Sequence, residues 1–260
     1  MTLRNFAGGL LHQICGVAAD SAFHPKRIFL VSHMRSGSSL LAHVLSSHPE
    51  ILGSGELHKN YARHGALARM TGKILCSGSQ WKKLGRGCYF LDKILHPHLH
   101  PPHENPTTSH RYLLLLREPA DTLASIVALE KQFGRFQGHE AERALFHYSE
   151  RLALLVTLHK SLDPAQVLII KYEDLTGNPE HVLASVSSHL SLRSPLQNTY
   201  QIQRQTGQAG SGDPSKVIFS GKILTQEEKG KRHPPAPSWA VERGLHHYSL
   251  AVRELLPERV

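Results

Sequence analysis

The sequence predicts an α/β fold, a three-layer sandwich in which a central parallel sheet is flanked by helices. Short, mostly apolar runs recur along the chain and alternate with longer segments of helical periodicity. Within the runs, apolar and polar residues do not alternate. Continuously apolar strands are typical of a parallel sheet that is covered on both faces. The chain has 260 residues, enough for one α/β domain with a sizeable core.

The expected elements follow in chain order. Strands are expected at 27–32, 51–52, 88–95, 111–116 and 166–171. Helices are expected at 38–47, 58–71, 119–133, 140–161 and 179–190. His48-Pro49 ends the first of these helices, and Pro119 occupies the first turn of the third, where a missing N–H costs nothing.

The domain organisation follows from the same pattern. Residues 1–26 are expected to be an N-terminal leader or surface helix, because their apolar stretch is too broken for a signal peptide. Residues 27–260 form a single domain. Its residues 193–260 are polar and rich in Gly, Gln, Ser and Pro, so we expect a loop-rich C-terminal flap.

Composition limits the partners and the compartment. The net charge of +9 suits an anionic nucleotide, an acidic substrate, nucleic acid or a membrane surface, and does not choose among them. No nucleic-acid-binding motif occurs and only 7% of residues are aromatic, so nucleic acid is disfavoured as a partner.

The chain contains no run of 18 apolar residues, so no transmembrane helix is predicted. The widely spaced Cys15, Cys76 and Cys88 indicate reduced thiols in a cytoplasmic protein. The sequence gives no prediction of oligomeric state.

The loop after the first expected strand is the most informative segment. It consists of Arg35, Ser36, Gly37, Ser38 and Ser39. A strand, a tight loop and a helix start together bind phosphate, because unpaired N–H groups and the helix dipole favour an anion there. We expect Gly37 to let a ligand approach the backbone and Arg35 to offer a planar fork to oxyanions. The alternative is an ordinary Ser-rich helix cap.

Two familiar nucleotide loops are absent after this strand. No Lys precedes the hydroxyl pair, so the triphosphate pattern G-x-x-x-x-G-K-[ST] is missing. The dinucleotide pattern G-x-G-x-x-G is missing as well. A P-loop nucleotide kinase or NTPase therefore remains an alternative of lower rank, and the loop favours another phosphate or sulfate ester.

R-S-G-S-S-L-L after a buried strand resembles the 5′-phosphosulfate loop of sulfotransferases that use 3′-phosphoadenosine 5′-phosphosulfate (PAPS). It is similar to the Arg-containing loop of the carbohydrate, tyrosyl-protein and bacterial enzymes, more than to the loop of the cytosolic phenol enzymes. In R-Y-L-L-L-L-R-E-P-A-D-T-L-A-S, Arg117 and Ser125 resemble the family's 3′-phosphate pair. A dianionic phosphate requires such a guanidinium and hydroxyl on one wall. The alternatives are a salt bridge of Arg117 to Glu118 or Asp121, and a small helix residue at Ser125.

The resemblance extends over about residues 27–190, since V-L-I-I-K-Y-E-D-L at 167–175 resembles a strand ending that recurs in the family. It implies transfer of a sulfuryl group from PAPS to a hydroxyl acceptor, with the nucleotide PAP as product and no metal requirement. Arg35 would stabilise the leaving group. H-P-E-I-L-G-S-G-E resembles a tyrosyl-protein sulfotransferase segment whose last residue is the general base, here Glu56. The competing base is His96, and Lys93 would neutralise charge on the transferred group.

Late segments are less specific. S-G-D-P-S-K-V-I-F-S-G-K-I at 211–223 resembles the loop that closes over the nucleotide, with Lys216 and Lys222 at the 3′-phosphate; the alternative is a basic surface loop. Trp239 either stacks on a substrate sugar or the adenine, or packs against other side chains of the protein. Residues 96–103 are rich in His and Pro, and we interpret them as a solvated loop without metal-ligand geometry.

The acceptor cannot be deduced from a fold. The Arg-containing loop favours a carbohydrate or glycolipid hydroxyl first, a small natural-product alcohol second and a protein tyrosine third. A catalytically degenerate protein that only binds PAP is a further alternative.

Overall fold

The chain folds around a five-stranded sheet whose strand order is β2-β3-β1-β4-β5. The computed structural model describes residues 3–53, 55–77, 81–84, 88–102, 110–134, 137–203, 206, 216–229 and 233–257. The strands are β1 (Lys26–Ser32), β2 (Ile51–Leu52), β3 (Tyr89–Ile94), β4 (His110–Leu116) and β5 (Val167–Lys171). All neighbouring pairs are parallel, which confirms the predicted sheet.

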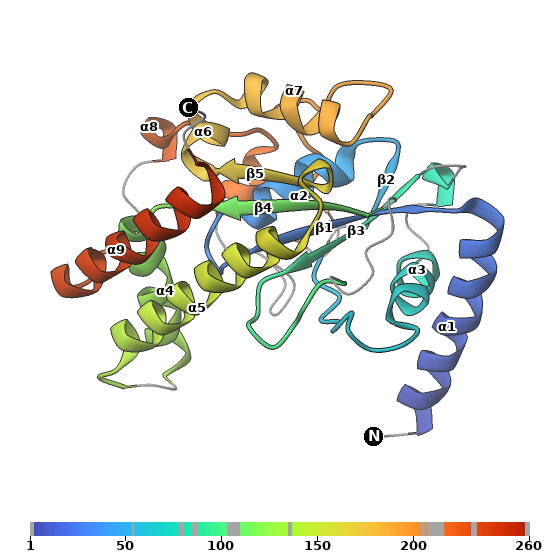
Figure 1. Ribbon diagram of the computed structural model, residues 1–260, viewed down its shortest axis with the longest axis horizontal. Helices are drawn as coiled ribbons and strands as arrows, with labels where there is room; N and C mark the ends of the chain where they lie inside the picture. Colours follow the sequence, from blue (N-terminus) through green and yellow to red (C-terminus); the bar gives the residue numbers. More distant parts are fainter. Residues whose placement is uncertain are drawn as a thin grey trace.

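Helices cover both faces of the sheet, as Figure 1 shows. One face carries α2 (Ser38–Ser47), α6 (Tyr172–Gly177) and α7 (Pro179–His189), and the short α8 (Gln226–Lys229) lies beyond α6. The other carries α1 (Leu3–Phe23), α3 (Ala66–Cys76), α4 (Pro119–Phe133), α5 (Glu140–Ser161) and α9 (Ser238–Leu255). The predicted three-layer α/β sandwich is thus confirmed.

Each face has its own apolar core. In β1, Ile28 and Leu30 belong to the core under α2 and α7, whereas Phe29 and Val31 belong to the core under α4 and α5. Successive side chains of a strand point to opposite faces, so a strand between two helical layers must be apolar at every position. This explains why the runs lack alternation.

The predicted start of one helix is wrong. Residues 58–71 were expected to be helical, but α3 begins at Ala66, after Gly65 with a left-handed φ of 69°. The preceding segment turns at residues 61–65 and is held by tertiary contacts: Tyr61 N–H donates to His100 O at 3.0 Å and its hydroxyl donates to Asp92. Local periodicity could not reveal contacts with residues over 30 positions away.

The prediction of a loop-rich flap is wrong for part of the tail, because α9 covers 18 residues of it. Its buried face is made mostly of small residues, including Ala240, Gly244 and Ala251. A Cβ on Gly244 would lie 2.8 Å from the Pro119 side chain, so this glycine lets α9 approach α4 closely. Small residues on a polar helix give little apolar signal, which is why the helix was missed.

The N-terminal helix α1 is packed into the fold against α3. A Cβ on Gly16 would lie 1.7 Å from Ala68 O, and one on Gly72 would lie 1.7 Å from His12 O. Two glycines therefore allow the helix backbones to touch, and Asp20 adds an ion pair to Arg27 at 2.5 Å. None of the helices in the described part of the chain has the length and apolarity that a bilayer crossing needs.

Candidate active site

The candidate residues gather at the carboxyl ends of the strands, where open parallel sheets bind ligands. Arg151 on α5 ties these ends together, because its guanidinium donates to Ser32 O, Ile94 O and His96 O at 2.9, 2.9 and 3.0 Å. Its side chain is fully buried, and burial lowers its pKa to about 10, so it remains charged at neutral pH. Sequence reasoning missed Arg151, since nothing distinguishes it from the exposed arginines of a helix.

The loop 33–37 connects β1 to α2 through two residues with left-handed backbone, Arg35 at φ 60° and Gly37 at φ 89°. A Cβ on Gly37 would lie 2.3 Å from the Tyr172 ring, so the ring occupies that side of the loop. Ligand approach to the other side of Gly37 stays a prediction. Ser36 and Ser38 are buried, and Ser36 Oγ accepts the Ser38 N–H at 3.3 Å. The start of α2 directly follows, with its dipole aimed at the loop.

The first cluster, called here the nucleotide side, joins the loop to β4 and α4. Arg35 Nε donates to Ser125 Oγ at 2.7 Å, and Arg117 Nη1 donates to Arg35 O at 3.1 Å. The Arg117 guanidinium also stacks on the Tyr172 ring, 4.3 Å from its centroid. The predicted 3′-phosphate pair thus lies beside the predicted phosphosulfate loop.

The alternative role of Arg117 is present as well. Its Nη2 lies 3.2 Å from Asp121 Oδ2, one turn into α4. The Asp121 side chain is 58% exposed, and such exposed ion pairs contribute at most about 1 kcal/mol. A dianionic ligand could therefore displace this carboxylate from Arg117 at small cost.

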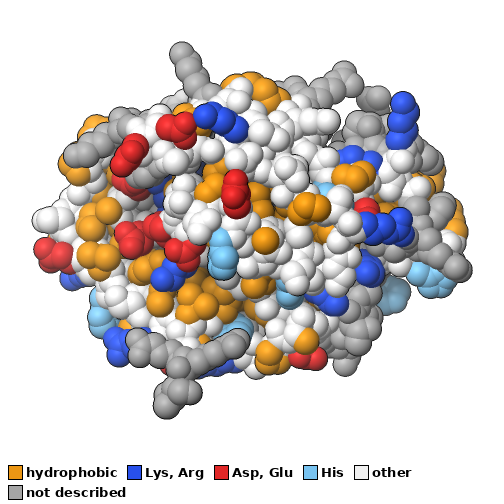
Figure 2. Space-filling view, turned by 90° about the horizontal axis from the view of Figure 1, so that it is seen from above, with side chains coloured by type: hydrophobic (Ala, Val, Ile, Leu, Met, Phe, Trp, Pro, Cys, Tyr) orange, Lys and Arg blue, Asp and Glu red, His pale blue; other side chains and the backbone are white. Residues whose placement is uncertain are grey.

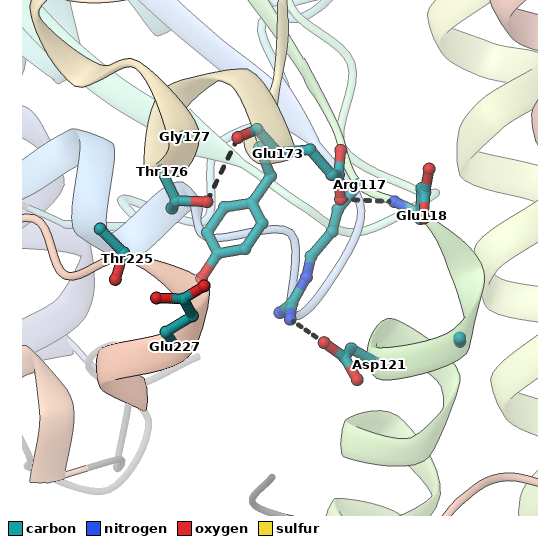
Figure 3. A pocket seen from close by; sticks show the side chains of 10 residues that line it. Arg117, Glu118, Asp121, Glu173, Thr176, Gly177, Thr225 and Glu227 are labelled. Atoms are coloured by element: carbon teal, nitrogen blue, oxygen red, sulfur yellow. Dashed lines mark hydrogen bonds and ion pairs between the residues drawn. The ribbon is translucent and has the colours of Figure 1, made fainter. Parts of the chain in front are cut away.

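A cavity of about 540 Å³ opens next to Arg117. Figure 3 shows the Arg117 side chain extending into it toward Asp121, with Thr225 and Glu227 on the opposite wall. The lining residues are Arg117, Glu118, Ala120, Asp121, Tyr172, Glu173, Thr176, Gly177, Thr225 and Glu227.

The cavity is rich in hydrogen-bond acceptors. Glu173 accepts the Glu118 N–H at the start of α4 at 3.1 Å, and burial raises its pKa. In Figure 2 the acidic side chains lie mainly on the left of the face, where Figure 1 places α6 and α8.

The second cluster, called here the acceptor side, lies at the end of β3. Lys93 Nζ is 3.0 Å from Ser39 Oγ at the start of α2 and 3.0 Å from Glu56 Oε1. Both charged side chains are largely buried, with 3% and 13% exposed. His96 Nε2 lies 3.7 Å from Glu56 Oε2, so the two candidate bases occupy the same cluster. Burial lowers the pKa of His96, which keeps it neutral near pH 7.

Asp92, which sequence reasoning missed, supports this cluster. Its Oδ1 accepts the N–H groups of Leu57 and Lys93, both at 2.8 Å, and its Oδ2 accepts the Tyr61 hydroxyl at 2.6 Å. It is fully buried, and burial raises its pKa to about 6. A charged residue inside the apolar run F-L-D-K-I-L was the available signal.

Three further predicted contributors stay untested. The side chain of Lys216, with residues 211–215 and His103, lies outside the described residues. Lys222 is paired with Glu228 at 3.0 Å and is 53% exposed. The Trp239 ring is 38% exposed and carries the Arg243 guanidinium 5.7 Å from its centroid.

Comparisons with known proteins identify a similar family and a similar fold. A family model described as Sulfotransferase family matches residues 109–195, which include Arg117, Ser125 and the Y-E-D-L segment. No curated protein matches the sequence.

Two solved structures resemble the whole fold. The sulfotransferase domain from the curacin biosynthetic pathway has 22% identity and a TM-score of 0.60, covering 86% of this chain and 98% of that one. The sulfotransferase domain from the Synechococcus PCC 7002 olefin synthase has 20% identity and a TM-score of 0.54, covering 86% and 94%. The predicted resemblance is thus confirmed: the chain has the sulfotransferase fold, and its residues 109–195 match the sulfotransferase family in sequence.

Proposed function

We propose that the protein is a sulfotransferase that moves the sulfuryl group of PAPS to a hydroxyl acceptor. The observation that carries this proposal is the convergence of Arg35, Arg117 and Ser125, linked by hydrogen bonds of 2.7 and 3.1 Å. The first residue follows β1 and the other two follow β4, so two separate anion contacts meet at one edge of the sheet. PAPS carries two anionic groups, a 3′-phosphate and a 5′-phosphosulfate, which this arrangement suits.

The cavity beside Arg117 suits the uncharged part of the donor. Four carboxylates and one guanidinium line it, from Glu118, Asp121, Glu173, Glu227 and Arg117. Such a lining repels a further phosphate but accepts hydrogen bonds from an adenine amino group and ribose hydroxyls. We therefore place the nucleoside in the cavity, with the 3′-phosphate at its Arg117 rim.

The acceptor side supplies the groups that transfer needs. In the proposed step, the acceptor oxygen forms a bond to sulfur in line with the breaking bond to the 5′-phosphate oxygen, and PAP leaves. The acceptor proton passes to Glu56 or, as the second candidate, to His96. Lys93, which lies between Ser39 and Glu56, and Arg35 stabilise the charge that develops on the leaving group.

The acceptor class remains ranked as the loop predicts it. A carbohydrate or glycolipid hydroxyl is the first candidate and a small natural-product alcohol the second. Incubation with radiolabelled PAPS and a panel of both classes identifies the acceptor. The assay contains EDTA, because transfer that persists in EDTA separates this proposal from a metal-dependent nucleotide kinase.

Titration with PAP tests the donor site directly. Replacing Arg117 by Ala should weaken PAP binding about 10- to 100-fold, since hydrogen bonds to charged groups contribute about 1.5–3 kcal/mol. The control is Arg253→Ala, which removes an exposed arginine of α9 and should leave the affinity unchanged. Calorimetry that detects no PAP binding, or equal affinity for wild type and Arg117→Ala, contradicts the proposal.

A further inference from the structure

Three potential metal ligands converge beside the acceptor side. Glu56, His58 and His96 each offer one ligand atom, and all three atoms lie within 4.8 Å of one another. The first two belong to the segment before α3 and the third follows β3. No metal site was expected at residues 96–103, but the fold brings Glu56 and His58 from a second segment to His96.

The three ligand atoms face one another without bonding. Glu56 Oε2 lies 3.9 Å from His58 Nε2 and 3.7 Å from His96 Nε2, too far for direct hydrogen bonds. The other carboxylate oxygen, Oε1, is held by Lys93 at 3.0 Å. Lys93 thus fixes the carboxylate orientation that leaves Oε2 directed at both imidazoles.

The spacing fits a small tetrahedral cation. Bonds of about 2.1 Å to nitrogen and oxygen place tetrahedral ligands about 3.4 Å apart. This is a few tenths of an ångström less than the separations of 3.9 and 3.7 Å between Glu56 Oε2 and the two imidazole nitrogens. His58 is half exposed and its ring lies against that of His96, 5.6 Å between centroids, so a small rotation of its side chain would close the remaining gap. His96 is held more firmly, because Arg151 binds its backbone carbonyl at 3.0 Å. Two imidazoles and one carboxylate favour zinc or a similar borderline cation over magnesium or calcium.

We propose that Glu56, His58 and His96 bind a zinc-class divalent cation that switches the acceptor side off. The cation binds a lone pair on Oε2 of Glu56, whose Oε1 is already bound by Lys93, and the lone pair on Nε2 of His96. It therefore prevents either group from accepting the acceptor's proton. The inhibitory consequence rests on the proposed sulfotransferase function, whereas the binding itself does not.

The binding is tested on the untagged protein without nucleotide. Zn²⁺ affinity is measured by competition with a chromogenic chelator, and Co²⁺ serves as a visible-absorption probe of tetrahedral coordination. His58→Ala should weaken the tightest site at least about tenfold, because even a residue outside the ligand set can contribute that much to metal affinity. The tetrahedral Co²⁺ absorption should decrease with it.

His98→Ala is the matched control. Its exposed imidazole stacks on His96 at 5.7 Å between centroids but is not one of the three ligands. This variant should keep the wild-type affinity. Unchanged Zn²⁺ affinity in His58→Ala, or an equal loss in His98→Ala, overturns the site.

A second measurement tests the switch. Zn²⁺ should inhibit transfer in the wild type, and His58→Ala should need at least about tenfold more Zn²⁺ for the same fractional inhibition, relative to its own zinc-free rate. Zinc binding without inhibition overturns the switch and leaves the site standing. Zinc binding by a protein that transfers no sulfuryl group contradicts the proposed function alone.

Discussion

The nucleotide side and the acceptor side are built in different ways. Arg35, Arg117 and Ser125 lie where strands end and helices begin, so the regular βα units place them. Glu56 and His96 lie on irregular segments that depend on distant contacts, chiefly those of Asp92 and Arg151. The first arrangement is set by local βα geometry, whereas the second depends on a few buried polar groups.

The two sides also differ in whether their side chains can accept a proton. Arginines hold the nucleotide side, and a guanidinium keeps its charge at any physiological pH. The acceptor side contains carboxylate and imidazole groups, whose lone pairs can accept a proton. One side is thus suited to hold a permanent anion, and the other to accept a proton. If this division is correct, variants on the two sides should affect different measurements.

The largest effect is expected from Glu56→Gln. Loss of a general base should lower kcat about 10³-fold, while PAP affinity stays at the wild-type value because the nucleotide side is untouched. Single-turnover rates and PAP calorimetry measure the two quantities. Glu50→Gln is the control, since Glu50 lies in the same segment and forms an ion pair with the exposed Arg193 instead of Lys93. A weakened PAP affinity with an unchanged kcat would contradict the assignment of Glu56 to proton transfer.

A smaller effect is expected from Gly37→Ala on the nucleotide side. The left-handed φ of 89° costs an alanine about 1–2 kcal/mol, and overlap with the Tyr172 ring adds about 1–3 kcal/mol. We expect a loss of about 3 kcal/mol in the free energy of unfolding, with weaker PAP binding.

Gly138→Ala is the matched control for this change. Gly138 has a φ of 85° but no atom within 4 Å of a Cβ, so only the backbone cost of about 1–2 kcal/mol applies. Denaturant unfolding measures both variants. Equal losses would show that contact with Tyr172 does not constrain the loop.

The same difference between local and distant contacts explains which residues could be predicted from the sequence. The spacing of Arg117 and Ser125 on a strand and a helix start determines their geometry, so a local pattern was enough to find them. Asp92 and Arg151 act through residues that are distant in sequence, and no pattern announces that a helical arginine will bond three strand-end carbonyls. Likewise, α9 is buried through small residues whose apolar signal is weak.

Asp92→Asn is expected to leave transfer and PAP binding the least changed, and its effect on stability appears as a dependence on pH. Burial raises the pKa of Asp92 to about 6 in the folded protein, above about 3.9 when unfolded. The contribution of Asp92 to stability is therefore full below about pH 4 and is lost as pH rises through about 6.

The asparagine variant keeps one oxygen for the Leu57 and Lys93 N–H groups, and its amide can donate to Tyr61, so the fold should persist. From pH 7.5 to pH 4, the wild type should gain up to about 3 kcal/mol relative to the variant in denaturant unfolding. Parallel pH profiles would show that Asp92 does not titrate in the fold, and a change in PAP affinity would show that the acceptor side also supports the nucleotide side.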